Sequence, residues 1–357
     1  MTRISMKKIK EYEILKVIAI ILVVVGHSTY YNIYTGYGGI EYQQYINNHL
    51  SLAVYKLLSK LTEIIYYFHM PLFMAISGAF FSIQVKNNRW HGIGSLLTNK
   101  FRRLMIPFFV FTLVYTIPIK YISNYFDGIN FWKAVSGQLF LLGNSHLWYL
   151  YALFIVFIVG FYILKKRTLF DVYLLLYILH ILSYSVHLTL VSAPLQYLFW
   201  FSMGFLFEFK RKQYNHYLKN NKWLSFLLVL LFIACVALKF VLKDNHEVLN
   251  RIIMDLAAVL GSLICYNISY YLSDKRELTE NRLFNVILIN GLGIYIFSDT
   301  LNYLILNISY SISNRFMFTA FGILALFLIR IFFTLFIGLG LTLLFKKIFK
   351  KHSWLVN

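Results

Sequence analysis

Long apolar stretches recur along the chain, and they constrain its fold more than any other feature of the sequence. An α-helix needs about twenty predominantly apolar residues to cross the hydrocarbon core of a bilayer. Hydrophobic residues make up 59% of the 357 residues, whereas charged residues make up only 13%. We therefore predict an all-α, polytopic membrane protein with about ten transmembrane helices, over residues 13–33, 61–82, 104–122, 144–164, 168–187, 193–209, 223–242, 250–272, 284–307 and 317–345.

The basic residues provide an independent test of this scheme. With both termini in the cytoplasm, the cytoplasmic segments hold roughly three times as many Lys and Arg residues as the opposite side, which is the bias expected of such loops. The formal net charge of +20 therefore indicates orientation and contact with lipid headgroups rather than nucleic-acid binding. The cytoplasmic clusters are Arg3 to Lys10, Lys86 to Arg103, Lys165 to Arg167, Lys210 to Lys222, Lys275 to Arg282 and Lys346 to Lys351.

The first apolar stretch, Glu13 to Tyr31, carries two ionisable residues, Lys16 and His27. Their positions differ by eleven, so both should lie on one face of a helix, ~16 Å apart along its axis. Ionisable residues inside a membrane are costly and indicate a functional site. The alternative is that Lys16 extends its charged end to the interface while His27 bonds a neighbouring helix. The shared face at two depths favours function for the pair.

Motif searches narrow the possible chemistry. The sequence has no GxxxxGK[ST] phosphate loop, no HExxH motif or paired cysteines for a metal, and no GxSxG nucleophile elbow. We therefore expect no metal site. Basic, imidazole and polar side chains near the ends of the predicted spans remain as candidates.

A basic cluster of Lys100, Arg102 and Arg103 lies at the start of the third predicted span. Lys100 and Arg103 are three residues apart and so are neighbours on a helix, whereas Arg102 faces elsewhere. Cations at a cytoplasmic helix end suit a phosphate-rich cofactor, because arginine offers two parallel donors and lysine a point charge. The alternative is a stop-transfer signal that contacts lipid headgroups.

The second predicted span contains the stretch YFHMPLFMAISGA, residues 67–79. Pro71 frees a backbone carbonyl, and the small residues from Ser77 onward permit close approach of another helix. His69 either lines a cavity or packs against its neighbours.

Two further polar groups lie in later spans. His146 and Trp148 begin the fourth span, where an aromatic residue either marks the membrane interface or stacks on a sugar ring. Asp299 and Asn302 share one face of the ninth span. The candidate substrate-binding residues are His69, Ser77, His146, Trp148 and Asp299.

The chain resembles the integral-membrane acyltransferases of the type 3 family, and within it the sugar O-acetyltransferases related to fucose acetylases. The resemblance rests on Lys16 and His27, FHMPLFMAISG, Lys100-x-x-Arg103 with the following Leu104 and Ile106-Pro107, and HLWYLYAL, in this order. The family's R-x-x-R thus falls on Lys100 and Arg103. Ser298 stands where many members have histidine. The likeness covers essentially the whole chain, so we expect a single membrane domain over residues 1–357.

The resemblance implies transfer of an acetyl group from cytoplasmic acetyl-CoA to a hydroxyl of a cell-envelope or exopolysaccharide sugar, in the bacterial plasma membrane. His27 would act as the general base or as a transient acyl carrier, and the residues leave both open. Lys16, Lys100, Arg102 and Arg103 would bind the cofactor. The expected partners are a glycan or lipid-linked sugar and membrane lipids, without nucleic acid. The competing hypothesis is an exporter of a glycan or lipid-linked sugar, which would release no CoA.

Overall fold

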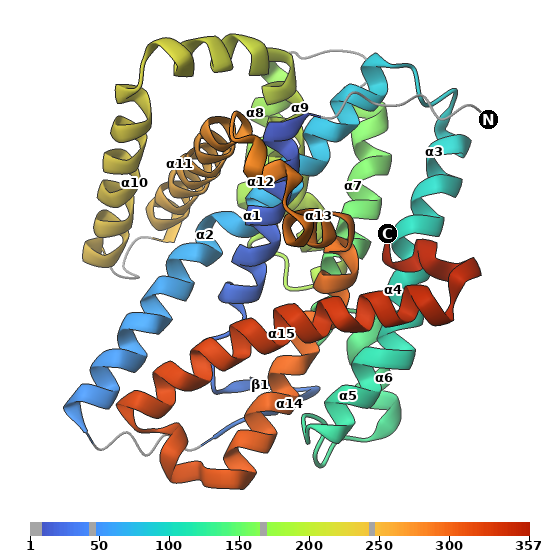
Figure 1. Ribbon diagram of the computed structural model, residues 1–357. Coiled ribbons are helices and arrows are strands. Elements are labelled where there is room, and N and C mark those ends of the chain that lie inside the picture. The colour runs from blue at the N-terminus through green and yellow to red at the C-terminus, as the bar shows by residue number, and fades with distance from the viewer. Residues whose placement is uncertain (1–8, 43–47, 165–169, 243–246) are drawn as a thin grey trace.

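The computed structural model of the chain describes residues 9–42, 48–164, 170–242 and 247–357. Regular structure in these residues is helical except for one antiparallel hairpin, β1 (Ile33–Thr35) with β2 (Gly38–Ile40) (Figure 1). The predicted all-α, polytopic membrane fold is therefore confirmed.

Seven of the basic residues assigned to loops lie outside the described residues: Arg3, Lys7, Lys8, Lys165, Lys166, Arg167 and Lys243.

The first half of the chain contains most of the candidate residues. Its helices are α1 (Lys10–Gly26), α2 (His49–Lys86), α3 (Ile93–Lys100), the π-helical η1 (Phe101–Met105), α4 (Ile106–Phe111), the π-helical η2 (Thr112–Thr116), α5 (Ile117–Ile122), α6 (Phe131–Leu139) and α7 (Trp148–Leu164).

The second half completes the bundle. Its helices are α8 (Phe170–Ser183), α9 (Thr189–Asn220), α10 (Trp223–Leu242), α11 (Glu247–Ser273), α12 (Arg276–Glu280), α13 (Arg282–Ile289), α14 (Gly291–Met317), α15 (Ala320–Ile348) and the 3₁₀ turn η3 (Lys350–Val356). The helical backbone of α14 is interrupted at Ser313.

Among the described residues, six helices are long and apolar enough to cross a membrane, or seven if α13 and α14 form one bent span. Shorter apolar helices, α7 and α8, add to them. Each predicted span overlaps a helix or a chain of helices, although the boundaries differ. For example, α1 ends at Gly26, well before residue 33, and α2 already begins at His49.

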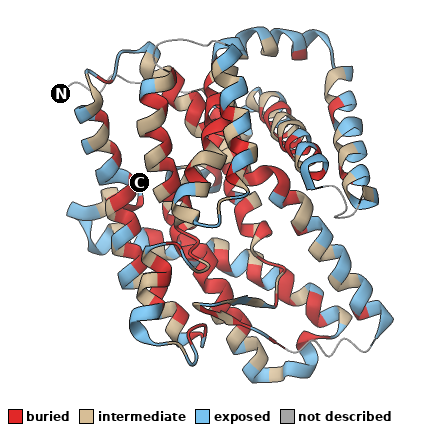
Figure 2. Cartoon of the chain, turned by 180° about the vertical axis from the view of Figure 1, so that it is seen from behind, coloured by how far each residue is buried: buried red, intermediate tan, exposed pale blue. Residues whose placement is uncertain are grey.

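The helix α1 lies at the centre of the bundle, where it packs against α2, α11, α13, α14 and α15. Its buried residues include Tyr12, Ala19 and Val24. Figure 2 shows buried residues concentrated on the central helices and exposed residues on the outer ones. The helix that carries Lys16 and His27 is therefore surrounded by protein for most of its length.

The helices α2 and α9 pack at very short range through two glycines. A Cβ atom at Gly78 would lie 1.8 Å from the carbonyl oxygen of Phe201, and one at Gly204 would lie 1.9 Å from that of Ala75. No larger residue fits at either position. Small residues allow this kind of backbone contact between helices in membranes, and the contact fixes the part of α2 that follows His69.

Two π-helical turns interrupt the span formed by Ile93–Ile122. Each turn ends two residues before a proline, Pro107 after η1 and Pro118 after η2. Proline cannot donate a hydrogen bond to the preceding turn, and a π turn, with its i→i+5 bonds, accommodates the missing donor. The first of these turns places Arg102 and Arg103.

A sharp bend of 81° separates α13 from α14. Asn290 ends α13 with non-helical backbone angles, and its side-chain oxygen accepts a hydrogen bond from Lys346 Nζ at 2.7 Å. The bend brings the first turn of α14, with Gly291 and Leu292, to the base of a cleft described below.

Candidate active site

His27 lies directly after the last turn of α1, where three oxygen atoms surround its Nδ1 atom. Asp299 Oδ1, from α14, is 3.0 Å away. The hydroxyl oxygens of Tyr30 and Tyr66 are each 3.1 Å away. The hydroxyl of Tyr30 also donates to Asp299 Oδ1, at 3.0 Å. Residues far apart in the sequence therefore converge on one nitrogen of this histidine.

The carboxylate of Asp299 determines which nitrogen of His27 is basic. A carboxylate only accepts hydrogen bonds, so we assign the ring proton of neutral His27 to Nδ1. The lone pair is then on Nε2. In the part of the chain that the structure describes, no residue forms a hydrogen bond with Nε2, and the side chain is 21% exposed. Nε2 is therefore the atom available to a reactant.

His146 lies on the other side of Asp299. Its Nδ1 atom is 3.7 Å from Asp299 Oδ2, and its Nε2 atom is 2.9 Å from the carbonyl oxygen of Ile296. The hydroxyl of Tyr295 donates to the backbone carbonyl of His146. The structure thus brings two of the sequence-predicted residues, His146 and Asp299, together with His27.

Arg330 secures the backbone that carries His27. Its side chain is completely buried, and its Nε atom donates to Asn302 Oδ1 at 2.9 Å. Its terminal nitrogens donate to the carbonyl oxygens of Tyr30, at 2.8 Å, and His27, at 3.0 Å. Carbonyls at the end of a helix have no partner within the helix, so this guanidinium supplies it and holds His27 in place.

The inner cleft is a cavity of about 320 Å³ at the end of the bundle where α1 begins. Lys16, Lys100 and Arg103 all line it. Lys16 Nζ lies 4.0 Å from the ring centre of Phe80, and Lys100 Nζ lies 3.4 Å from that of Phe157. None of its lining residues is acidic. The structure thus brings together three of the four predicted cofactor-binding residues.

The deep end of the inner cleft approaches the histidine cluster. Ser77, Tyr149 and Tyr295 line this end, and the hydroxyls of Ser77 and Tyr149 are 3.1 Å apart. The rings of Tyr149 and Tyr295 are 5.6 Å apart. Tyr295 also bonds the backbone carbonyl of His146. The side chains of Tyr149 and Tyr295 therefore lie between the cleft and Asp299.

The outer cleft is a second cavity, of about 620 Å³, beside the middle of α2, whereas the inner cleft lies along its C-terminal part. Polar and charged side chains dominate its lining, which consists of Glu63, Tyr66, Tyr67, Lys239, Glu247, Asn250, Arg251 and Met254. Tyr66 contributes to this lining while its hydroxyl contacts His27. The outer cleft therefore reaches the histidine cluster through a single tyrosine side chain.

The remaining predicted residues lie elsewhere. Arg102 lines neither cleft, and its guanidinium lies 4.5 Å from the ring centre of Trp354. His69 is buried beside His27, with a ring-centre distance of 6.5 Å, and bonds the carbonyl of Ile65. Trp148 packs against Tyr197, at 4.9 Å, and lines neither cleft.

Sequence reasoning missed Tyr30, Tyr66 and Arg330. Tyrosine is frequent in this chain, with 28 residues, so neither tyrosine stands out. Arg330 carried a usable signal, because it is a cation within a predicted span, and such residues indicate function.

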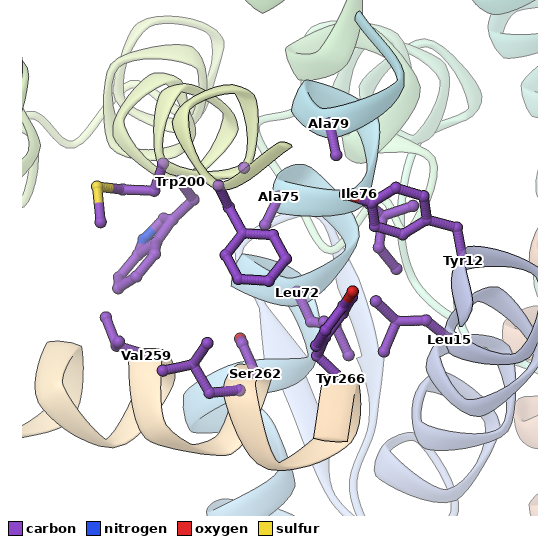
Figure 3. Close-up of a pocket in the computed structure, with 14 residues that line it drawn as sticks. Tyr12, Leu15, Leu72, Ala75, Ile76, Ala79, Trp200, Val259, Ser262 and Tyr266 are labelled. Atoms are coloured by element: carbon purple, nitrogen blue, oxygen red, sulfur yellow. The ribbon is translucent and has the colours of Figure 1, made fainter. Parts of the chain in front are cut away.

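An apolar pocket of about 110 Å³ lies between α1, α2, α9 and α11. Figure 3 shows Leu72, Trp200, Val259 and Tyr266 converging on it. Ile76 lines both this pocket and the inner cleft. Nearly all of its lining is apolar, so the pocket offers no chemistry of its own.

Together these features define a polytopic membrane protein with a half-buried histidine between a cationic cleft and a polar one. A model of the acyltransferase 3 family, described as an acyltransferase domain, matches residues 9–346. The chain therefore belongs to the acyltransferase 3 family and is a multi-pass membrane acyltransferase. No curated protein and no solved structure matches the chain.

Proposed function

We propose that this protein transfers an acetyl group from cytoplasmic acetyl-CoA to a hydroxyl of a cell-envelope or exopolysaccharide sugar, as a sugar O-acetyltransferase of the plasma membrane. The observation that carries the proposal is the position of His27, between a cationic cleft and a polar cleft that line successive stretches of α2. Membership of the acyltransferase 3 family supplies the reaction class.

The inner cleft has the charge that a coenzyme A donor requires. Lys16, Lys100 and Arg103 line it, and no lining side chain is acidic. Arg103 also donates to the backbone oxygen of Asn357 at 3.4 Å. Charge-assisted hydrogen bonds to phosphate are among the strongest that proteins form. Towards its deep end, apolar residues such as Ile20 and Phe73 suit the thin pantetheine arm. We therefore assign the phosphates to the three cations and the thioester to the region of Ser77 and Tyr149.

The outer cleft has the lining that a sugar requires. Tyr66 and Tyr67 offer aromatic rings, and Glu63, Glu247 and Asn250 offer hydrogen-bonding groups for hydroxyls. The basic residues of the sequence place this end of the bundle outside the cytoplasm. We therefore assign the outer cleft to the acceptor, whether a glycan or a lipid-linked sugar.

In the direct mechanism, His27 Nε2 removes the proton from the sugar hydroxyl while that oxygen attacks the thioester carbon. The C–S bond then breaks, and the thiolate of CoA takes up a proton, so that the products are the sugar ester and free CoA. Asp299 keeps the Nδ1 proton in place and stabilises the imidazolium that forms. Arg330 holds the His27 backbone at the correct position.

In the covalent mechanism, His27 Nε2 attacks the thioester first and carries the acetyl group to the sugar. Both mechanisms use the same nitrogen and the same contact with Asp299. Rapid quenching of the protein with acetyl-CoA alone separates them, because only the covalent route acetylates the protein before any acceptor is present.

The experiment that tests the proposed function measures base-labile acetate on envelope polysaccharide. Cells that express the protein should carry acetate esters that cells expressing His27→Ala at equal abundance lack. Purified protein in vesicles should release free CoA from acetyl-CoA over many turnovers only when this polysaccharide is present. Export of glycan without release of CoA would overturn the acetyltransferase and favour the exporter.

A further inference from the structure

A third groove, of about 690 Å³, lies on a different face of the α3–α4 span from the inner cleft. Three basic residues line it, Arg102, Lys351 and His352, together with aromatic and aliphatic side chains. Figure 1 shows the C-terminal turn η3 beside α4, and the two elements are in contact. We call this cavity the basic groove.

The cations of the basic groove have no acidic counterpart. None of its lining residues, all in the described part of the chain, is acidic. Across the described residues, neither Arg102 nor Lys351 forms an ion pair. Arg102 stacks on the ring of Trp354, and stacking leaves the N–H groups at the edge of a guanidinium available to an anion.

Apolar residues line the basic groove beside its cations. Ile106 follows Arg102 by four residues, about one helical turn, and both line the groove. The ring of Phe101, 47% exposed, lies 6.0 Å from that of Phe154, and both also line it. The groove therefore combines cations with an apolar surface on the same face of the span.

We propose that the basic groove binds an anionic phospholipid, with the phosphate at Arg102, Lys351 and His352 and an acyl chain along Phe101, Ile106 and Phe154. The cations match an anionic headgroup, and the apolar lining beside them matches a lipid chain. Coenzyme A carries the same phosphate chemistry, and the second measurement below distinguishes it from the lipid. This lipid site is independent of the acetyl transfer proposed above.

Native mass spectrometry of the purified protein tests the proposal with phosphatidylglycerol and phosphatidylcholine of identical acyl chains. The unchanged protein should bind phosphatidylglycerol more tightly. Arg102→Ala with Lys351→Ala should weaken phosphatidylglycerol binding about tenfold or more and leave phosphatidylcholine binding unchanged. The matched control, Lys210→Ala with Lys212→Ala, removes the same charge from exposed positions outside the groove and should have no such effect. Equal losses in both double variants, or none in the first, would overturn the proposal.

A second measurement separates the lipid from the cofactor. The affinity of the Arg102→Ala, Lys351→Ala protein for free CoA, measured by isothermal titration calorimetry, should equal that of the unchanged protein. A loss of CoA affinity as large as that of Lys100→Ala would instead assign the groove to the cofactor nucleotide and overturn the lipid site.

Discussion

The inner and outer clefts line successive stretches of one helix, yet they differ in charge and in the residues that connect them to His27. The inner cleft carries three cations and no acidic side chain, whereas the outer cleft mixes Glu63 and Glu247 with Lys239 and Arg251. The inner cleft meets the histidine cluster through a wall of tyrosines, and the outer cleft meets it through Tyr66 alone.

The difference in charge between the two clefts suggests how one site could receive reactants from two sides of a membrane. Residues 63–67 of α2 line the outer cleft and residues 73–84 of the same helix line the inner one. His27 lies beside the stretch between them. In the proposed mechanism each cleft would select its own ligand by charge, and neither would need to move its ligand across the bilayer.

The largest expected effect is at His27, which lies between the two clefts. His27→Ala and His27→Asn should each lower acetyl transfer by about 10⁴-fold, to background, because neither side chain can carry the proton or the acetyl group. Binding of CoA should be unaffected. Steady-state release of CoA in vesicles measures the first quantity and calorimetry the second. Activity retained in either variant would remove His27 from the mechanism.

The next effect tests the orientation of His27. Asp299→Asn keeps the size of the side chain but removes the carboxylate that fixes the Nδ1 proton, so kcat should fall about 100-fold. The KM for acetyl-CoA and the KM for the acceptor should stay the same, since Asp299 lines neither cleft. A change confined to either KM would show that Asp299 binds a substrate instead.

A moderate effect should separate the two clefts. Lys100→Ala and Arg103→Ala each remove a charge-assisted contact worth ~1.5–3 kcal/mol, so the KM for acetyl-CoA should rise roughly tenfold to hundredfold. The KM for the acceptor should be unchanged. Lys210→Ala, an exposed residue that lines neither cleft, is the matched control. If only the acceptor KM changes, the cations belong to a different site.

The smallest effect should lie on the outer side. Tyr66→Phe removes one hydroxyl beside His27, so kcat/KM for the acceptor should fall about two- to tenfold. The KM for acetyl-CoA should stay constant. Tyr162→Phe changes an exposed tyrosine, 62% accessible, and serves as the control. Equal losses in both variants would contradict the role of Tyr66.

The sequence predicted the fold well because span length and loop charge are local properties. The positions of most helices followed from apolar stretches, but their ends moved, and the ninth predicted span is divided by a bend of 81° between α13 and α14. For example, the structure begins α2 at His49, where Val54, Tyr55 and Leu58 pack against an apolar cluster that a span-length criterion does not detect. The structure also ends α1 at Gly26, and Arg330 bonds the carbonyls of the following residues His27 and Tyr30.

The candidate site was only partly predictable. The spacing of Lys16 and His27 predicted one helix face at two depths, and the structure places Lys16 in the inner cleft and His27 beyond its deep end. The pairing of His27 with Asp299 joins α1 to α14, and apolar patterns do not specify which helices pack together in a membrane. The sequence spacing also predicted that Arg102 faces away from Lys100 and Arg103. Its charge had nevertheless suggested that it binds the same cofactor, whereas in the structure its guanidinium lies against Trp354.

The central claim is that His27 is reached by the donor from one side of the membrane and by the acceptor from the other. Vesicles of determined orientation test it directly, with acetyl-CoA supplied to one side and the acceptor polysaccharide to the opposite side. We predict CoA release and sugar acetylation only when acetyl-CoA is on the side of Lys100 and the acceptor is on the side of Glu63. Equal activity with the two substrates exchanged, or acetylation with acetyl-CoA only on the side of Glu63, would contradict the account.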